Sequence, residues 1–564
     1  MCGLAGYINH HTFMQDDVLE AMLAKIKHRG PDVTDMYFDK QAKVALGHNR
    51  LSIIDTSESA NQPMRINHVT LVFNGEIYNF LELKNKYLQD QIFDTHSDTE
   101  VLLLLYIKFG LVKTLSLIRG MFAFALYDKN KQKAFVARDH VGKKPLYYFQ
   151  DEDGLFFASE IRAFKPLNKN LYDLNDEVFT NAMYYRASSE LSPYMGIKML
   201  ENGHYLSIDI PVFNLTKNQY FNFNDLICEN KYKKYCSLSK NEIIEEFDKL
   251  LTRSIKRRLV ADVNVASINS GGVDSSLISA VAYKLGQLKM LHVDVDEFSE
   301  LEYAQLLANH LNEELLVLKV TKEDLEKNID QIIDSYEFPL VHPNSYGISQ
   351  VSKLAQENNI TVLLGGEGAD ELFAGYGYQR KYYIGQKISK WIPSFIKNMY
   401  SKSHFVFNDI ADQKAYQRAF YCQQKSVVTN SFNKSFNKYV FIPNIIERNT
   451  QAYLLNDLNE YLQPLLLRAD KMAMKYSIEM RSPFLDLEII EFALNLPLKY
   501  KLSMTQGKKI VKSIAKKYLP KEIINRKKAG FAFPFIDKCL MDPLVSQDRN
   551  YILYSKKRLK NQYY

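Results

Sequence analysis

The chain has 564 residues, enough for two large domains, and its 46% hydrophobic and 24% charged residues are typical of globular proteins. Its 72 Lys and Arg against 65 Asp and Glu leave a net charge of only +7, which argues against a nucleic-acid partner. The five cysteines are sparse and form no Cys-x-x-Cys pair, which argues against a disulfide framework and a cysteine zinc site.

The chain carries no evident targeting or membrane segment. No basic region followed by an apolar one opens the sequence, so we expect no signal peptide. The apolar stretch 101–127 is interrupted by Lys108, Lys113 and Arg119, which argues against a membrane span. We therefore expect a cytoplasmic protein that contacts no membrane.

A cysteine stands at position two. If Met1 is removed, Cys2 carries both a thiol and a free α-amine, and the amine can act as the general base for the thiol. The alternative is that Cys2 is a small apolar residue in a first strand. Position alone does not decide between the two interpretations.

The next segments predict a strand-rich region. Strand 71–73 runs into Asn74-Gly75, which can offer a side-chain amide and a backbone N–H as an oxyanion hole, or can be a hairpin turn. Asp98 precedes the helical stretch 101–109 and can be a plain helix cap. Segments 119–128 and 135–139 then read as the two strands of a hairpin.

From residue 239 onward the pattern alternates between helix and strand. Helices are expected at 241–259, 277–285, 301–311, 322–336 and 348–356, and strands at 263–268, 290–295, 315–320 and 360–364. Such alternation predicts a doubly wound parallel sheet with the ligand at the carboxyl ends of the strands.

The stretch Ser270–Ser276 turns strand 263–268 through two glycines into a helix. Unpaired N–H groups at a helix start bind anions, and glycines let the backbone approach a phosphate. Within this loop, Ser275 and Ser276 add hydroxyl donors, and Asp274 could hold Mg²⁺ on the phosphates. No Gly-Lys-Ser/Thr follows, so this is not a Walker A loop. The alternative is an ordinary capped turn.

A second glycine-rich turn, Gly365–Phe373, follows strand 360–364 and carries three carboxylates. Acidic residues at a helix start often only complement its dipole. Beside a nucleotide loop, Asp370 would be well placed for Mg²⁺, and Glu367 could act as a base or orient ammonia.

Several segments, in order along the chain, together resemble the glutamine-hydrolysing asparagine synthetases. Residues 1 to about 165 resemble the glutaminase domain of class II, N-terminal-nucleophile glutamine amidotransferases. The segments that carry the resemblance are Cys2-Gly3, His28–Asp32, Arg50–Asp55, Asn74–Asn79, Ser97-Asp98, Arg119–Asp128, Arg138–Tyr147, Ser270–Ser276, Gly365–Phe373, Leu466–Met474, Glu479–Asp486 and Arg526–Phe531.

The resemblance implies a mixed α/β and α+β fold with two catalytic domains. An N-terminal-nucleophile αββα glutaminase domain is expected over residues 1–205 and a connector over 206–238. A doubly wound ATP-pyrophosphatase (adenylating) domain is expected over 239–540, followed by a mobile basic tail, 541–564.

The resemblance also implies residue roles in glutamine hydrolysis. Cys2 would attack the side-chain amide of glutamine, and Asn74 and Gly75 would form the oxyanion hole. Arg50 would pair with the α-carboxylate and Asp98 with the α-ammonium, with Glu76 also in the glutamine site. The products would be glutamate and ammonia.

In the second domain the resemblance implies ATP and Mg²⁺ as the nucleotide and its metal ion. Asp274 and Asp370 would hold Mg²⁺, Glu367 would be catalytic, and Lys528 would meet the phosphates. The remaining ATP and pyrophosphate residues would be Asn269, Ser270, Gly271, Gly272, Asp274, Ser275, Ser276, Val295, Gly365 and Gly366. Glu479 and Arg481 are interpreted as a structural ion pair, and Met121 as a lining residue of an ammonia passage.

The reaction would adenylate a carboxylate and then replace AMP by ammonia. Aspartate is the favoured acceptor by resemblance, and a sugar uronic acid is the alternative. Asn269, Gly365, Asp294 and Asp296 depart from the usual family pattern and could alter nucleotide or acceptor contacts. A silent scaffold and a β-lactam-forming enzyme are weaker alternatives, because Cys2 and its expected partners are all present. A homodimer is expected by resemblance.

Overall fold

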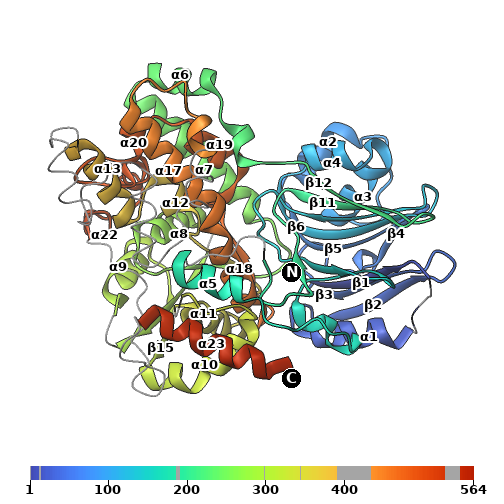
Figure 1. Ribbon diagram of the computed structural model, residues 1–564. Coiled ribbons are helices and arrows are strands. Elements are labelled where there is room, and N and C mark those ends of the chain that lie inside the picture. The colour runs from blue at the N-terminus through green and yellow to red at the C-terminus, as the bar shows by residue number, and fades with distance from the viewer. Residues whose placement is uncertain are drawn as a thin grey trace.

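The computed structural model describes residues 2–11, 14, 16–185, 191–286, 288–296, 299–342, 344–389, 434–526 and 547–563. The N-terminal half forms a layered domain on one side of the molecule and the C-terminal half a helix-rich domain on the other (Figure 1). The N-terminus lies at the boundary between them (Figure 1). In the described part of the chain, no helix combines the length and the apolar character needed to cross a bilayer.

The N-terminal domain stacks two six-stranded sheets, ordered β10-β8-β9-β1-β3-β2 and β12-β11-β7-β6-β5-β4. Helix α1 (Asp16–Lys25) covers one outer face, and helices α2 (Phe80–Tyr87), α3 (Asp98–Phe109) and α4 (Leu111–Leu117) cover the other, which is the expected αββα layering (Figure 1). Apolar side chains such as Leu4, Val72 and Phe157 fill the space between the sheets. The strands are β1 (Gly3–Asn9), β2 (Val33–Asp39), β3 (Val44–Arg50), β4 (Met64–Ile66), β5 (Val69–Ile77), β6 (Gly120–Asp128), β7 (Lys133–Arg138), β8 (Tyr147–Gln150), β9 (Gly154–Ala158), β10 (Lys198–Met199), β11 (His204–Asp209) and β12 (Asn214–Gln219).

Two strands correct the expected end of this domain at residue 205. Strand β11 pairs with β7 and β12 pairs with β11, so both extend the second sheet. Leu206 and Ile208 are buried in its core. The rest of the expected connector, from Cys228 onward, docks on the second domain, where the Cys228 N–H donates to Asn495 Oδ1 at 2.7 Å. The sequence did not predict β12 because this edge strand has exposed side chains, so its polar, Asn-rich composition shows no apolar run.

The C-terminal domain is built on a five-stranded parallel sheet, ordered β15-β14-β13-β16-β17. Successive residues of β14 face opposite helical layers: Met290 packs with α8 and α9, whereas Leu291 and Val293 pack with α10 and α11. The doubly wound prediction is therefore confirmed. The strands are β13 (Val265–Ile268), β14 (Lys289–Val295), β15 (Leu315–Val320), β16 (Val362–Leu364) and β17 (Glu479–Arg481).

The predicted helices and strands between residues 239 and 364 all form, with shifts of a few residues at their ends. Within the described residues, the helices with eight or more residues are α1 (Asp16–Lys25), α2 (Phe80–Tyr87), α3 (Asp98–Phe109), α5 (Asp176–Tyr185), α6 (Glu229–Ser237), α7 (Lys240–Arg258), α8 (Val273–Leu285), α9 (Leu301–Leu311), α10 (Lys322–Tyr336), α11 (Ser345–Glu357), α13 (Gly377–Ser389), α17 (Ile445–Glu460), α18 (Leu462–Met474), α19 (Leu487–Asn495) and α23 (Gln547–Tyr563). Shorter ones are α4 (Leu111–Leu117), α12 (Ala369–Phe373), α20 (Leu498–Lys501), α21 (Lys509–Ala515) and α22 (Lys521–Asn525).

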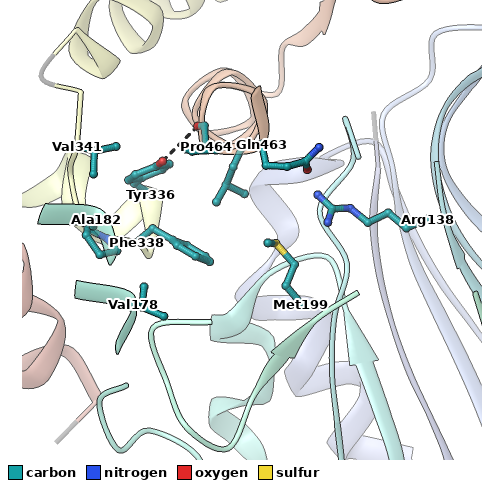
Figure 2. A pocket seen from close by; sticks show the side chains of 11 residues that line it. Arg138, Val178, Ala182, Met199, Tyr336, Phe338, Val341, Gln463 and Pro464 are labelled. Carbon is teal, nitrogen blue, oxygen red and sulfur yellow. Dashed lines mark hydrogen bonds between the residues drawn. The ribbon is translucent and has the colours of Figure 1, made fainter. Parts of the chain in front are cut away.

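A small apolar cavity lies where the two halves meet. It is lined by Met199 and Val178 from the N-terminal half and by Tyr336, Phe338 and Pro464 from the C-terminal half, with the Tyr336 hydroxyl donating to the Pro464 carbonyl at 3.3 Å (Figure 2). None of its lining residues belongs to the pockets described below.

Helix α23 corrects the expectation of a mobile tail. Its residues Tyr551 and Leu559 are buried, and it packs on α10 and α5 (Figure 1). Arg558 pairs with Asp334 at 2.6 Å, and the Tyr194 hydroxyl donates to the Leu559 carbonyl at 3.3 Å. The helix therefore contacts both domains. The many charged residues of this segment suggested a tail, although its apolar residues are buried.

Two leucines of α23 allow a matched test of this packing. We expect Leu559→Ala to lower the opening free energy of α23 by about 2–5 kcal/mol, because Leu559 is fully buried. Leu553 lies on the same helix and is 41% exposed, so Leu553→Ala should lower the opening free energy by less than about 0.5 kcal/mol. Native-state hydrogen exchange measures both values, and equal losses would contradict the docking of α23.

Candidate active sites in the two domains

Cys2 directly precedes β1, a central strand of its sheet, and is almost completely buried. Its N–H donates to Asn74 Oδ1 at 3.0 Å, and its carbonyl accepts from Arg29 Nε at 3.2 Å. Burial raises the pKa of the Cys2 thiol. The cysteine is thus held in place through its backbone, and it lines a pocket.

Asn74 and Gly75 are not a hairpin turn, because β5 continues through them and pairs with β6 up to Ile77. The buried Nδ2 of Asn74 donates no hydrogen bond within the described part of the chain. A Cβ at position 75 would lie 2.0 Å from the Met121 carbonyl oxygen, so only glycine fits there. The amide of Asn74 therefore keeps a donor available beside Cys2.

The pocket at Cys2 gathers the predicted glutamine-site residues Arg50, Gly75, Glu76 and Asp98. Arg50 is oriented by its own loop, since Nη1 donates to the Ser57 carbonyl at 2.7 Å and to Asn61 Oδ1 at 2.6 Å. The pocket presents one cation and two carboxylates within a buried space.

Asp98 is not the helix cap. Ser97 caps α3 by accepting from the Glu100 N–H, whereas Asp98 Oδ2 accepts from the Ile77 N–H at 2.7 Å. Burial raises the pKa of Asp98 to about 6. Its carboxylate is therefore fixed between α3 and β5 and faces the pocket.

Glu76 connects this pocket to the second domain. Burial, together with Glu479 and Asp98, holds the pKa of Glu76 well above its usual range. Arg481 Nη2 lies 3.5 Å from Glu76 Oε1, and Arg481 Nε donates to Glu479 Oε1 at 2.5 Å. The interpretation of Glu479 and Arg481 as an ion pair is confirmed, on β17, a strand without an apolar run that the sequence did not predict.

In the C-terminal domain, the Ser270–Ser276 loop follows β13 as predicted. Ser270 and Ser275 share a hydrogen bond of 3.0 Å between their hydroxyls, and Gly271 adopts a left-handed φ of 66°. Asn269 ties the loop down, since its Oδ1 accepts from the Gly271 N–H at 3.1 Å and its Nδ2 donates to the Ala304 carbonyl at 3.0 Å. The unusual asparagine thus has a structural use.

The second glycine turn packs directly against the first. A Cβ at Gly366 would lie 3.3 Å from both Asp274 Cβ and the Ser275 nitrogen. The two turns line one pocket, which contains the predicted residues Asn269, Ser270, Gly272, Asp274, Ser275, Gly365, Gly366, Glu367 and Asp370. The predicted residues Gly271, Ser276 and Val295 do not line it; the Val295 side chain lies in the core, and Lys528 lies outside the described residues.

Lys508 was missed by the sequence analysis and joins the two predicted metal ligands. Its Nζ pairs with Asp274 and, at 2.6 Å, with Asp370 Oδ1. These carboxylates raise the pKa of the buried lysine. Gly375 leaves room for the pair, because a Cβ there would lie 2.1 Å from Lys508 Cε. Lys508 is 234 residues from Asp274 in the chain, so no local sequence pattern could predict this contact.

The pocket also contains three polar residues that the sequence analysis did not assign, namely His292, Asn344 and Arg468. Arg468 Nη1 donates to Asn344 Oδ1 at 2.7 Å, and Arg468 Nε is buried without a hydrogen bond to any described residue. Arg468 lies in a segment noted for its family resemblance, which was the available signal.

These two sites define a glutamine-dependent amidotransferase joined to an ATP-using synthase domain. A family model described as asparagine synthase matches residues 246–563, and one described as a glutamine amidotransferase domain matches residues 1–221. The chain belongs to the asparagine synthase family, and it is a ligase that uses glutamine and ATP.

Named relatives share most of their length with this chain. Asparagine synthetase (glutamine-hydrolyzing) 1 of Bacillus subtilis is 32% identical over 566 residues, covering 95% of this chain and 87% of the relative. A second such synthetase of B. subtilis is 27% identical, covering 94% and 72%. The chain is also 28% identical to amidase chry2 of Gibberella zeae, covering 95% and 89%.

The buried Asp98 predicts a pH-dependent stability in the absence of glutamine. Because its pKa is raised, the folded state binds the Asp98 proton more tightly than the unfolded state, so wild-type stability falls as pH rises from about 4 to about 6. Asp98→Asn keeps an acceptor for the Ile77 N–H but carries no titrating group, so its stability should not fall over this pH range. We expect Asp98→Asn to melt at a higher temperature than wild type near neutral pH.

The difference should vanish below about pH 4, where the acid is neutral in both states. Asp94→Asn, at an exposed aspartate four residues earlier, is the control and should follow the wild type across the range. A melting temperature of Asp98→Asn below that of wild type at neutral pH would contradict the assignment.

Proposed function

We propose that the chain is a glutamine-hydrolysing asparagine synthetase that amidates the β-carboxylate of aspartate. The observation that most strongly supports this proposal is the pairing of a buried Cys2 beside the Asn74 amide with a second pocket formed by two glycine turns. One site would release ammonia and the other would consume it.

In the first site, Cys2 would attack the side-chain amide of glutamine. Asn74 Nδ2 and the Gly75 N–H would stabilise the oxyanion, because preorganised donors act where negative charge develops. Arg50 would bind the α-carboxylate of glutamine, and Asp98 the α-ammonium, with Glu76 behind them. The amide C–N bond then breaks, ammonia leaves with the proton lost by the thiol, and water releases glutamate from the Cys2 thioester.

In the second site, the acceptor carboxylate would attack the α-phosphorus of ATP and displace pyrophosphate. The Ser270–Ser276 turn would hold the pyrophosphate through its backbone N–H groups. Asp274 and Asp370 fit Mg²⁺, which takes one or two carboxylates plus phosphate oxygens, and both already face the Lys508 cation. Lys508 and Lys528 would neutralise the phosphate charge, and bound Mg²⁺ would add to this neutralisation.

Ammonia would then attack the acyl carbon of the adenylate. The C–N bond forms, the C–O bond to AMP breaks with its electron pair on AMP, and one proton leaves the nitrogen. Glu367 lines the pocket and would accept that proton. A passage between the sites, a homodimer and a cytoplasmic location stay predictions.

The acceptor is proposed from charge. Aspartate brings a second carboxylate, and Arg468 supplies a buried cation in the same pocket, oriented by Asn344. The alternative acceptor, a sugar uronic acid, is favoured by a different observation: His292 and Asn344 are uncharged polar groups of the kind that bind hydroxyls, and some relatives are named amidases.

Pyrophosphate exchange separates these acceptors. With ATP and Mg²⁺, we expect aspartate to support isotope exchange between pyrophosphate and ATP, and glucuronic acid to support none. Arg468→Met should weaken aspartate binding by about tenfold or more, since a charge-assisted hydrogen bond is worth about 1.5–3 kcal/mol. Exchange with glucuronic acid alone would replace aspartate as the proposed acceptor.

Cys2→Ala tests whether the first site serves only to supply ammonia to the second. We expect this variant to release no glutamate from glutamine and yet to form amide with ammonium chloride at near the wild-type rate, because ammonia bypasses the first site. Cys236→Ala, at an exposed cysteine, is the control and should retain glutaminase activity. A wild type that releases no glutamate would support the silent-scaffold alternative.

A further inference from the structure

A loop of the glutaminase domain, residues 139–144, enters the surface of the synthetase domain. The loop is held by one carboxylate, Asp139, which accepts five backbone hydrogen bonds of 2.7–3.2 Å. The donors are Phe122, Val141, Gly142, Lys143 and Lys144. So many bonds to one side chain fix the loop before any substrate binds.

The tip of this loop carries Lys143 toward the second site. Lys143 is 4% exposed, and its Nζ donates to Ser482 Oγ at 2.7 Å. The Ser482 hydroxyl in turn donates to Glu367 Oε2 at 3.3 Å. A side chain of the first domain thus reaches the carboxylate of the second site through one serine.

Gly365 provides the space for this arrangement. A Cβ at Gly365 would lie 2.4 Å from Glu367 Oε2 and 3.0 Å from Met480 Cε. Since the carboxylate is the flexible partner, a larger residue would push it away from Ser482. The glycine that departs from the usual family pattern therefore belongs to the same arrangement as Lys143.

We propose that Lys143 is a positioning residue for Glu367, so that the synthetase site is complete only when the glutaminase domain is docked. The inference rests on the proposed function, in which Glu367 accepts the proton lost when the C–N bond forms. A base needs a fixed orientation, and Lys143 supplies it through the Ser482 hydroxyl.

The charge of Lys143 supports this use. Burial lowers the pKa of Lys143 to about 8, and Glu367 opposes that shift; Lys144, Asp470 and Asp139 are the other charged groups acting on it. The lysine is therefore mostly protonated near neutral pH. It can hold a carboxylate, whereas a neutral residue of the same length cannot.

Two half-reactions give the test. In the full-length enzyme with ATP, Mg²⁺ and saturating ammonium chloride, we measure pyrophosphate exchange and amide formation with aspartate, or with glucuronic acid if aspartate gives no exchange. We expect Lys143→Met to leave exchange within about twofold of wild type and to slow amide formation by at least about tenfold. Lys143→Arg, which keeps the charge, should recover part of the loss.

Lys144→Met is the matched control. Lys144 is the next residue, is fully buried and crosses the same interface, but its Nζ lies 3.6 Å from Asp470 Oδ1 instead of Ser482. We expect this variant to lower the melting temperature at least as much as Lys143→Met. The ratio of amide formation to exchange should remain that of wild type.

Gly365→Ser perturbs the same carboxylate from the other domain. It should also slow amide formation, and the slowing in the double variant Lys143→Met with Gly365→Ser should be smaller than the product of the two single effects. Equal losses of exchange and amide formation in Lys143→Met, or no loss of either, would overturn the inference. A wild type that forms no amide from either acceptor would instead overturn the proposed function, and the inference with it.

Discussion

One guanidinium, that of Arg29, connects Cys2 in the first site to the second domain. Its Nε donates to the Cys2 carbonyl at 3.2 Å, its Nη1 pairs with Glu160 at 2.9 Å, and its Nη2 pairs with Asp470 of α18 at 2.9 Å. All these side chains are fully buried. A buried charge is tolerated only when it is paired, so the two domains have little freedom to slide without leaving an unpaired ion.

This constraint explains why the interface is rich in charge although hydrophobic packing would be more stabilising. Buried ion pairs contribute little net stability, but they penalise alternative geometries strongly. Two further ion pairs cross between the domains: Arg162 Nε lies 3.1 Å from Glu337 Oε1, and Arg481 Nη2 lies 3.5 Å from Glu76 Oε1. We interpret these inter-domain ion pairs as contacts that hold the two sites at a fixed distance from each other.

The sequence predicted what local patterns encode. Hydrophobic periodicity located β13 to β16 and their helices, and strand-to-helix glycine turns located the residues that line the second pocket. The sequence did not predict elements that depend on long-range contacts. Strand β17, for example, has no apolar run, and its charged residues Glu479 and Arg481 are buried because they pair with each other. Lys508 and Lys143 likewise depend on partners 234 and 339 residues away.

The departures from the family pattern then have a physical meaning that the sequence could not supply. Asn269 uses its side chain to tie the phosphate turn to α9, which an apolar residue could not do. Because Gly365 has no side chain, it leaves room for the carboxylate of Glu367. Both changes act on the position of groups that line the second pocket. Under the proposed function, which takes aspartate as the acceptor, these departures change how the second pocket is built and not which acceptor it takes.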